Sequence, residues 1–505
     1  MITLKVRNIF TDVEGELTAK QWGEFERALS FRPQGYQFSQ AFNTFIRDKT
    51  GKVIRRVWDG WKHQFWKNKT RTYFPTGLMS MAVDYLQKQG VQIRALDFRK
   101  KPEYNLHLDL AEFLEDRDYQ ISTVDEAYTR HRGTIQSATG SGKTAVAARI
   151  IHRLGVKPFV FFVTSIDLLT QAKDSFELFL RENGKPIKVG QIGGGVVDIR
   201  DVNVCTIQTA VRALGYEWDR KTKFDSDDTD DKTPIEQYRG QIVEMVHEAK
   251  GSIFDECQHV RAETCQIVAR ELKSAYYTFG MSATPYRDEG DDLMIMACFG
   301  KKIAQIKASD LIRGGWLVKP SIKIVHIPYE TNFRTWQSIY KDAVVENDKY
   351  NSIIAAIANK YVQNGRLVLI LVQQINHGKD IAARIPGAIF LSGNSPKKKR
   401  EQGLASMRNK DITCIVSTTI FDEGVDVKAL DTVILAGQGK SKTRALQRIG
   451  RILRPYTDEK TGCVKMSATA IDFRIHCKYL EEHSVAREDI YLTEPEFQIE
   501  HIQLD

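Results

Sequence analysis

The sequence lacks an apolar run that could cross a membrane. Its longest uninterrupted apolar stretch, Leu293–Phe299, is far shorter than the roughly 20 residues of a membrane-spanning helix. The charged residues Lys5, Arg7 and Asp12 come too early in the chain for a secretory signal peptide. We therefore expect a cytoplasmic protein with no membrane partner.

Paired cysteines are also missing. Seven cysteines are scattered over 505 residues, and none forms a C-x-x-C pair. This pattern argues against a zinc ribbon or a disulfide framework and fits a reducing compartment. No short-period repeat is present, and at this length the chain is expected to form two to four domains.

Acidic residues are nearly absent from one stretch, residues 51–74, where Asp59 is the only one. The chain has a net charge of +9, and this stretch concentrates basic and aromatic side chains, including three of its seven tryptophans. The stretch contains Lys52, Arg55, Arg56, Trp58, Trp61, Lys62, Phe65, Trp66, Lys67, Lys69, Arg71, Tyr73 and Phe74. Cations suit phosphates and flat rings suit bases, so a nucleic-acid surface is one interpretation. The alternative is that the tryptophans form the core of their own module.

A glycine-rich loop, Ser137–Thr144, lies between a short apolar strand and a helix-forming segment. Gly140 and Gly142 allow successive N–H groups to point at one anion, and the following helix adds the positive end of its dipole. In such a loop Lys143 reaches the phosphates and Thr144 holds Mg²⁺. Ser137 stands where the strict pattern has glycine, so a simple glycine turn remains an alternative.

An Asp-Glu pair follows another apolar strand, Ser252–Phe254. Asp255 is placed to hold Mg²⁺ and Glu256 to polarise the attacking water. Such pairs are common on surfaces, but carboxylates directly after a buried strand need a metal or a cation beside them. A further polar string, Ser282-Ala283-Thr284, follows the strand expected at Tyr276–Gly280.

Four arginines lie close together at residues 444–454, in the second half of the chain. Arg444, Arg448 and Arg451 fall on one helical face, and Arg454 follows one turn later. Guanidinium groups fit phosphate oxygens, so this half can lend arginines to a nucleotide held by the first half. A solvated basic helix face is the alternative.

Alternating strands and helices from residue 105 onward predict an α/β fold, with two parallel-sheet halves of one architecture and a small N-terminal α/β accessory domain. The expected domains are 1–100 (accessory, nucleic-acid-binding), 101–313 (first parallel-sheet half), 314–475 (second parallel-sheet half) and 476–505 (a polar tail). An acidic insertion at 225–231 is expected to form a loop.

In combination these strings resemble superfamily 2 helicases and translocases, with the motifs in the family's order over residues 117–455. The resembling segments are Tyr119-Gln120, Gly140–Thr144, Thr164–Gln171, Thr206–Thr209, Asp255–Gln258, Ser282–Thr284, Leu369–Val372, Ser417–Asp426 and Gln447–Arg454. Gln258 stands where many members have histidine; glutamine occurs there in DNA translocases of the superfamily.

The resemblance implies two tandem RecA-like domains, an ATP-binding helicase domain at 101–313 and a helicase C-terminal domain at 314–475. It also implies ATP and Mg²⁺ as cofactors, hydrolysis of ATP to ADP and phosphate, and a site residue for each role. The implied catalytic residues are Lys143, Asp255, Glu256, Gln258, Arg451 and Arg454. The implied nucleotide contacts are Gln120, Gly140, Ser141, Gly142, Lys143, Thr144, Gly424, Asp426 and Arg448. The implied metal ligands are Thr144 and Asp255. The candidate nucleic-acid contacts are Thr164, Gln208, Ser392, Gly393 and Thr418, together with Trp58, Trp61, Trp66, Arg55 and Arg56.

Four short strings carry a narrower resemblance: Gly35–Phe38, Trp58–Gly60 and Phe74–Gly77 in the N-terminal module, and Ser282–Glu289 in the first half. They resemble phage UvsW-type branch-migration helicases and the XPB-like group. This implies an ATP-dependent DNA helicase or translocase that acts on forks or junctions in replication, recombination or repair. Proteins of those pathways are the implied partners. For a viral chain, the implied location is the host cytoplasm. The alternatives are a duplex translocase without strand separation, an RNA helicase, and a non-catalytic nucleic-acid scaffold. Intact Lys143, Asp255, Glu256 and Arg451 count against the scaffold.

Overall fold

The computed structural model describes residues 1–33, 35–47, 53–216, 232–257, 262–283, 292–418, 427–439, 441–458 and 461–503. Gln258, Thr284, Gly424, Asp426 and the acidic insertion at 225–231 lie outside these ranges. The chain divides into two compact units. The first covers Met1–Ser137 and continues from Gly142 to Gln305, and the second covers Ile306–Asp505 with the loop residues Ala138–Ser141.

The N-terminal module is built on a five-stranded sheet in the order β7-β8-β2-β1-β9. The strands are β1 (Ile2–Val6), β2 (Phe10–Gly15), β7 (Trp66–Lys67), β8 (Thr72–Pro75) and β9 (Ile93–Asp97). Buried residues alternate along β1, so one face of the sheet is apolar. Two amphipathic helices, α1 (Ala19–Ala28) and α3 (Met79–Lys88), cover it with Phe25, Ala82 and Leu86.

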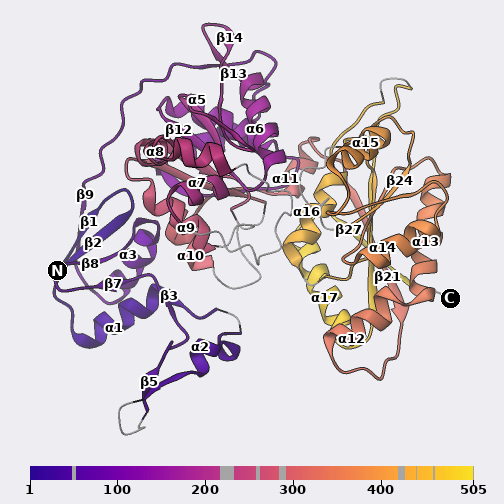
Figure 1. Ribbon diagram of the computed structural model, residues 1–505, viewed down its shortest axis with the longest axis horizontal. Coiled ribbons are helices and arrows are strands. Elements are labelled where there is room, and N and C mark those ends of the chain that lie inside the picture. Colours follow the sequence, from indigo (N-terminus) through magenta and orange to yellow (C-terminus); the bar gives the residue numbers. More distant parts are fainter. Residues whose placement is uncertain are drawn as a thin grey trace. The chain divides into compact units, whose positions relative to one another are not determined.

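An arm projects from this module between β3 (Ser30–Phe31) and β6 (Lys62–His63), which pair as an antiparallel neck. The arm contains a 3₁₀ turn, η1 (Tyr36–Phe38), the short helix α2 (Gln40–Asn43) and a hairpin of β4 (Phe45–Arg47) and β5 (Val53–Arg56). Figure 1 shows the arm extending away from the sheet of the module.

The first RecA-like domain has an eight-stranded sheet in the order β16-β15-β17-β12-β18-β19-β11-β20. Its parallel centre consists of β11 (Arg132–Ser137), β12 (Phe159–Val163), β17 (Val202–Thr206), β18 (Gly251–Phe254) and β19 (Tyr277–Ser282). The edges are β15 (Gly190–Gly193), β16 (Val196–Asp198) and β20 (Lys302–Ile306). A small separate sheet joins β10 (Asp109–Leu110), β13 (Leu180–Glu182) and β14 (Lys185–Pro186).

Helices cover both faces of this sheet, as parallel strands require. One apolar cluster forms under α4 (Asp118–Arg130), α5 (Lys143–Leu154) and α6 (Ile166–Phe179). A second forms under α7 (Ile207–Ala213), α8 (Lys232–Glu248), α9 (Ala262–Glu271) and α10 (Asp292–Phe299). The expected α/β layering is confirmed.

The second RecA-like domain has a seven-stranded parallel sheet in the order β23-β24-β22-β25-β26-β21-β27. The strands are β21 (Pro320–Pro328), β22 (Val368–Leu371), β23 (Ile389–Leu391), β24 (Cys414–Ser417), β25 (Thr432–Leu435), β26 (Ala468–His476) and β27 (Gln498–Gln503). The helices are α11 (Ala308–Arg313), α12 (Trp336–Tyr340) with the π-helical η3 (Lys341–Val345), α13 (Asp348–Gln363), α14 (Ile375–Ala383), α15 (Lys397–Arg408), α16 (Lys442–Ile452) and α17 (Leu480–Tyr491).

Residues 476–505, expected to be a polar tail, instead carry α17 and β27. Strand β27 pairs with β21 in the sheet, and α17 packs against β26 and α16. These residues are therefore part of the second domain, which also begins earlier, at Ile306, than the expected residue 314.

Among the described residues, no helix combines the length and the apolar character that a bilayer span requires.

Candidate nucleotide site and nucleic-acid surfaces

The phosphate loop connects β11 to α5. Gly140 and Gly142 have φ of +88° and +80°, a region open to glycine and strained for other residues. Helix α5 begins at Lys143 without a side-chain cap and without an acidic residue in its first turn. Its first N–H groups therefore remain available to an external anion. Ser141 and Ser137 are fully buried in the loop, and Thr144, in the first turn, is half-buried.

Asp255 and Glu256 follow β18 directly, at the same edge of the sheet as the loop. Lys143 Nζ donates to Glu256 Oε1 in an ion pair between largely buried side chains. Burial alone would lower the pKa of Lys143, but the carboxylates of Glu256 and Asp255 outweigh it, so the pKa is raised and the ammonium stays charged. The residues expected to bind phosphate, to hold the metal ion and to polarise water, Lys143, Asp255 and Glu256, therefore lie close together.

The backbone at Glu256 is strained. Its φ is +47°, the left-handed region that non-glycine residues adopt rarely. Two hydrogen bonds hold the turn: Glu256 N donates to Asp255 Oδ1 at 3.0 Å, and Cys257 N donates to Met281 O on β19 at 3.2 Å. The turn thus fixes the carboxylates relative to β19, whose last residue, Ser282, is fully buried.

Gln120 lies beside the phosphate loop. A Cβ added to Gly142 would be 3.0 Å from Gln120 Nε2. The side chain of Gln120 is 2% exposed, and its Oε1 accepts a 3.2 Å hydrogen bond from Arg149 Nε. Arg149 in turn donates to Asp116 Oδ1 and to the carbonyl oxygen of Glu115, each at 2.6 Å. The structure therefore brings Gln120, an expected nucleotide contact, to the loop through a network from α5.

Thr144 and Asp255 offer the oxygen donors that Mg²⁺ prefers. Within the described ranges, no cluster of three or more His, Cys, Asp or Glu side chains is placed to hold a metal ion. Two protein oxygens suit a Mg²⁺ ion that takes its other ligands from phosphates and water, as in other nucleotide sites. The residues present fit this ion, which remains a proposal.

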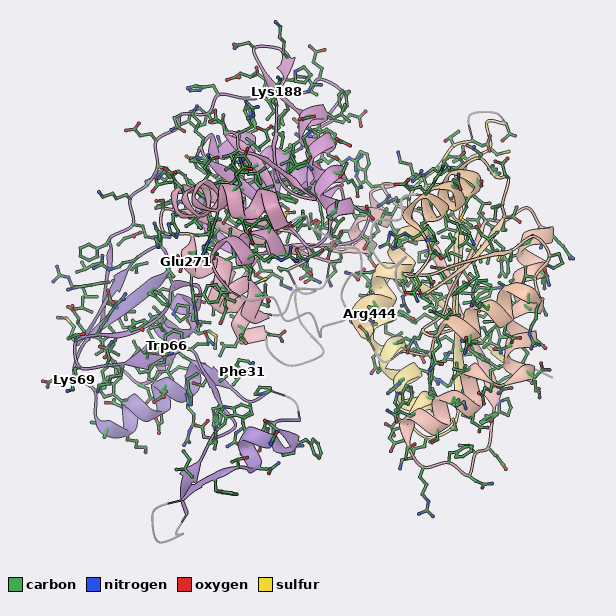
Figure 2. All side chains as sticks on the ribbon, in the orientation of Figure 1. Phe31, Trp66, Lys69, Lys188, Glu271 and Arg444 are labelled. Atoms are coloured by element: carbon green, nitrogen blue, oxygen red, sulfur yellow. The ribbon has the colours of Figure 1, made fainter. Side chains whose placement is uncertain are left out.

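The arginines of the second half lie on and beyond α16. Ser441 Oγ caps the helix by accepting from Arg444 N at 3.4 Å, and Arg444 lies in the first turn (Figure 2). Arg448 is 8% exposed and Arg451 is half-buried. The helix ends at Ile452, so Arg454, expected one helical turn further on, follows after the helix end.

Two predicted nucleic-acid residues in the first domain, Thr164 and Gln208, follow the neighbouring strands β12 and β17. Gln208 Nε2 donates to Thr164 O at 2.6 Å. Thr164 Oγ1 and Gln208 Oε1 are buried without a hydrogen-bond partner. Buried polar atoms are nearly always bonded, so these two are candidates for contacts made when a ligand binds.

Three predicted residues of the second domain are also brought together. Ser392 and Gly393 follow β23, and Thr418 follows its neighbour β24, where Thr418 N donates to Leu391 O at 3.3 Å. Helix α15 starts at this edge with Lys398 and Lys399 exposed. Sequence analysis missed these cations, although the run Lys397–Arg400 was a visible signal.

The three tryptophans of the N-terminal module have different surroundings. Trp58 Nε1 donates to Trp61 O at 2.7 Å, which closes the turn around Asp59. The guanidinium of Arg32 lies 4.8 Å from the ring centre of Trp61. Trp66 stacks on Tyr73 with ring centres 5.5 Å apart, and Arg270 of α9 lies 5.2 Å from its ring (Figure 2). The partly buried Trp58 and Trp61 stand at the base of the arm, whereas Trp66 packs between the module and the first domain.

Arg55 and Arg56 belong to β5 on the arm, where they pair with Ile46 and Phe45 of β4.

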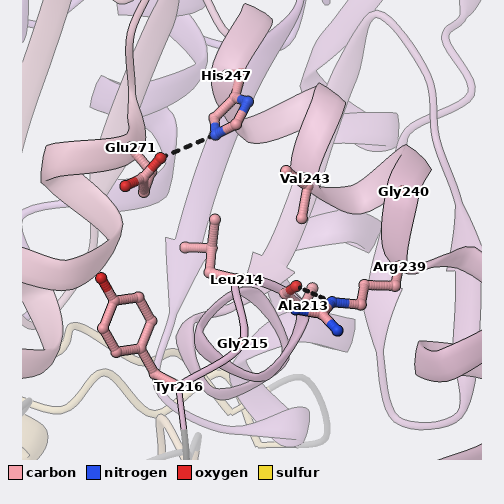
Figure 3. Close-up of a pocket in the computed structure, with 9 residues that line it drawn as sticks. All are labelled: Ala213, Leu214, Gly215, Tyr216, Arg239, Gly240, Val243, His247 and Glu271. Atoms are coloured by element: carbon pink, nitrogen blue, oxygen red, sulfur yellow. Dashed lines mark hydrogen bonds and ion pairs between the residues drawn. The ribbon is translucent and has the colours of Figure 1, made fainter.

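A surface pocket of about 500 Å³ lies elsewhere in the first domain, between α7, α8 and α9. Figure 3 shows His247 and Glu271 joined by a 2.9 Å hydrogen bond on one side and Tyr216 and Arg239 on others. None of its nine lining residues was predicted to be a site residue.

Comparison with known families agrees with this architecture. The family described as "Type III restriction enzyme, res subunit" matches residues 113–287, and the family described as "Helicase conserved C-terminal domain" matches residues 348–456. The two matches fall on the first and the second RecA-like domain.

Similar proteins extend the comparison. The ATP-dependent DNA helicase uvsW of Enterobacteria phage T4 is 23% identical over 522 residues, covering 96% of each chain. The DNA 3'-5' translocase XPB2 of Sulfurisphaera tokodaii is 25% identical over 403 residues, covering 72% of this chain and 84% of that protein. The structure of the ATP-dependent Type ISP restriction-modification enzyme LlaBIII bound to DNA is similar in fold, with a TM-score of 0.52 and 15% identity. That match covers 83% of this chain but only 34% of the LlaBIII chain. Both halves of the helicase architecture are present in order. The chain is therefore an ATP-using enzyme of helicase superfamily 2 and belongs to the DNA helicases and translocases of that superfamily.

Proposed function

We propose that this enzyme uses ATP to remodel branched DNA, at forks or four-way junctions. The observation that carries the proposal is the docking of the N-terminal module onto the first RecA-like domain. A motor domain that carries a fixed second DNA-binding element can hold one duplex arm while it moves along another. The phage T4 helicase matches over this module as well as over the motor, which supports the same reading.

The docking is tight at its centre. Residues Thr76–Leu78 pack against α10, and a Cβ at Gly77 would overlap the carbonyl oxygens of Met296 and Ala297. Leu293 and Ala297 of α10 complete the core of the module. The two parts therefore share one apolar core.

Polar contacts surround this centre. Arg132 at the start of β11 donates to Cys298 O and to Asn8 O, both at 2.5 Å, and so bridges the module and the domain. Buried Gln266 donates to buried Gln64 at 3.0 Å. Buried hydrogen bonds have defined directions, so they favour one docked orientation.

The arm supplies the surface for DNA in this proposal. Phe38 on η1 is 84% exposed, and Phe45 at the start of the hairpin is 42% exposed. The sequence from residue 45 to 56 contains five basic residues and only one acidic residue, Asp48. Exposed rings beside cations are suited to bases and phosphates.

We propose that Lys143 and Thr144 bind the ATP phosphates and Mg²⁺, that Asp255 holds the ion through water, and that Glu256 accepts a proton from the attacking water. The ion supplies charge neutralisation at the phosphates. Arg448, Arg451 and Arg454 are proposed to contact the nucleotide from the second domain, as the family resemblance implies. Gln120 is proposed to read adenine, and Gln258, Gly424 and Asp426 keep the roles expected from the sequence.

Thr164 and Gln208 of the first domain and Ser392, Gly393 and Thr418 of the second are proposed to contact the nucleic-acid backbone. In each domain these residues follow neighbouring parallel strands at one sheet edge. The exposed lysines at the start of α15 add charge to the second group.

The test is a panel of substrates with identical base composition: single-stranded DNA, plain duplex, a fork, a four-way junction and a fork made of RNA. ATPase stimulation and strand separation are measured on each with the wild type and with Lys143→Ala. We expect the fork and the junction to stimulate most and the Lys143→Ala variant to be inactive on all. Equal stimulation by plain duplex and junction would overturn the choice of branched DNA.

The second candidate is a duplex translocase that does not separate strands. The restriction-subunit family match to the first domain and the fold of LlaBIII favour it. It predicts displacement of a third strand from a triplex on plain duplex, with no unwinding of forks.

A further inference from the structure

Arg487 of α17 lies buried beneath the loop that leads into the arginine-bearing helix α16. It is 3% exposed and makes a two-pronged ion pair with Asp472 of β26, at 2.8 Å from Nε and 2.7 Å from NH2. Its NH1 donates to Gly439 O at 2.7 Å, and its NH2 lies within hydrogen-bond distance of Gln438 Oε1 at 3.1 Å and of Phe473 O at 3.2 Å. Two of its four partners therefore belong to the loop between β25 and α16.

Two tyrosines also hold the same loop. Tyr350 OH donates to Ala436 O at 3.1 Å, and Tyr340 OH donates to Gly437 O at 3.0 Å. Gln438 Nε2 also donates to Tyr350 OH at 3.2 Å. Gln438 has φ of +47°, so the loop holds a conformation that its own sequence disfavours. External hydrogen bonds are therefore what fixes the loop.

This loop sets where α16 starts. Gly439 is separated by a single residue from Ser441, the N-cap of α16, and Arg444 lies in the first turn. Helix α17 packs directly on α16. The charge of Arg448 acts on Tyr340 and Tyr491, where it opposes the upward shift that burial produces in the pKa of each tyrosine. The hydroxyl of Tyr491 donates to Asp472 Oδ2 at 2.9 Å, so helix and network are connected at a second point.

We propose that Arg487 is a positioning residue for ATP turnover: with Asp472 it fixes the loop 436–439 and thereby aims the arginines of α16. A buried ion pair is weak evidence for stability, because apolar residues of similar size can replace it without loss. The guanidinium fork is needed here because it reads two carboxylate oxygens and two loop acceptors at once. This inference rests on the proposed role of the α16 arginines.

The chain provides a matched control. Arg474 of β26 pairs with Glu488 of α17, so it joins the same two elements as Asp472 and Arg487. Within the part of the chain that the structure describes, its polar side-chain contacts are to Glu488 and to Ser484 and do not include the loop. Loss of this pair weakens the attachment of α17 without touching the loop 436–439.

The test compares Arg487→Lys with Arg474→Lys in the full chain, using DNA-stimulated ATPase with kcat and KM measured separately. Arg487→Lys keeps the charge and loses the fork, so we expect kcat to fall about ten- to a hundredfold with KM for ATP within about threefold. Arg474→Lys is expected to keep the wild-type kcat. An equal fall in both variants would reduce Arg487 to a structural role and overturn the proposal.

If Arg487→Lys does not fold, the double variant Arg487→Met/Asp472→Leu, which leaves no unpaired buried charge, takes its place with the same expected fall in kcat. Unchanged kcat in that folded variant would also overturn the proposal.

A double-mutant comparison separates this inference from the proposed function. If Arg487 acts through α16, the fall in kcat that Arg487→Lys causes should be smaller in the Arg451→Ala background than in the wild type. Multiplicative losses would show that Arg487 acts independently of Arg451, which contradicts the inference. If Arg451→Ala itself leaves turnover intact, the proposed role of the α16 arginines fails, whatever Arg487 does.

Discussion

Lys143 at the start of α5 and Glu256 in the turn after β18 form an ion pair within the first domain. The expected phosphate-binding cation and the expected general base thus neutralise one another across two neighbouring elements. Phosphate oxygens compete with Glu256 for the ammonium group, so nucleotide binding is expected to release the carboxylate. Glu256 then becomes available to accept a proton from water.

Glu256→Gln is therefore expected to separate binding from hydrolysis. The amide cannot accept the proton, so DNA-stimulated kcat should fall by about 10²-fold or more. It also pairs more weakly with Lys143, so the affinity for a non-hydrolysable ATP analogue should stay the same or rise. Steady-state ATPase and titration with a fluorescent analogue measure the two effects.

Glu248→Gln serves as the control for this variant, because Glu248 pairs with Lys250 on the exposed surface of the same domain. It should leave both quantities unchanged. Retention of hydrolysis within a few fold in Glu256→Gln would remove Glu256 as the general base.

Gly77→Ala is expected to weaken the docking of the N-terminal module. The new Cβ would overlap backbone oxygens of Met296 and Ala297, and backbone atoms cannot rotate away. Overpacking of this kind costs about 1–3 kcal/mol. We expect a lower melting temperature and faster proteolysis in residues 98–108, which connect the module to the first domain without a helix or strand.

Gly23→Ala is the matched control. Gly23 lies in α1 of the same module, and a Cβ there meets nothing within 4 Å. Alanine favours helix by up to about 1 kcal/mol over glycine, so this variant should be slightly more stable than the wild type. The docking argument fails if the two glycine substitutions have the same effect.

Much of this architecture could be predicted because its strands are buried on both faces. Strand β12, for example, is visible in the sequence because Phe159–Val163 is an unbroken apolar run, and the structure buries all of it. The phosphate loop and the Asp-Glu pair were equally visible, because each follows a largely buried strand, β11 and β18. The ion pair between Lys143 and Glu256 could not be predicted from the motifs alone, because it also depends on the register of the sheet.

The last 30 residues were not predictable in the same way. The residues that α17 buries are Leu480, Ser484, Arg487 and Tyr491, so two of the four positions on its inner face are polar. Strand β27 is an edge strand with no fully buried residue. Apolar periodicity is therefore weak in both elements, and it could not reveal that Arg487 is a buried hydrogen-bond donor.

The stability of the second domain is expected to fall in mild acid because of His377. This side chain is fully buried, and its Nε2 lies 2.9 Å from Asn351 Oδ1. Since Asn351 donates through its own Nδ2 to Asp380, its Oδ1 accepts and His377 Nε2 carries the proton. The other nitrogen, Nδ1, has no hydrogen-bond partner. A second proton would therefore have no acceptor.

Burial lowers the pKa of His377 to about 4, with Asp380 opposing the shift. The unfolded chain takes up a proton near its ordinary pKa of about 6.5, whereas the folded domain does so only near 4. Stability is thus complete above pH 6.5 and declines as the pH falls toward 4, by up to about 3 kcal/mol. Urea unfolding at pH 7.5 and pH 5 measures the difference.

His377→Gln should flatten this pH dependence, while His107→Gln, on the exposed surface of the first domain, should preserve it. An unchanged slope in His377→Gln would assign the acid sensitivity to other groups.

The arm of the N-terminal module is expected to contribute affinity for DNA through Phe38. Its ring is 84% exposed, so removing it leaves no cavity, and Phe38→Ala should melt at the wild-type temperature. Stacking on a base is worth about 1–3 kcal/mol, which corresponds to a loss of about five- to a hundredfold in fork affinity. Fluorescence anisotropy with a labelled fork, at two salt concentrations, measures the loss and separates it from the phosphate contribution.

Two further variants show what kind of residue carries the effect. Phe333→Ala removes a ring that is 53% exposed on the second domain, and it should bind the fork as the wild type does. Trp58→Phe removes the indole hydrogen bond to Trp61 O and should lower the melting temperature before it lowers affinity. The contrary outcome is that Phe38→Ala binds as tightly as the wild type, while Trp58→Phe weakens binding in proportion to its loss of stability. In that case the aromatic residues act only through the folding of the arm, and the cations of the arm alone hold the DNA.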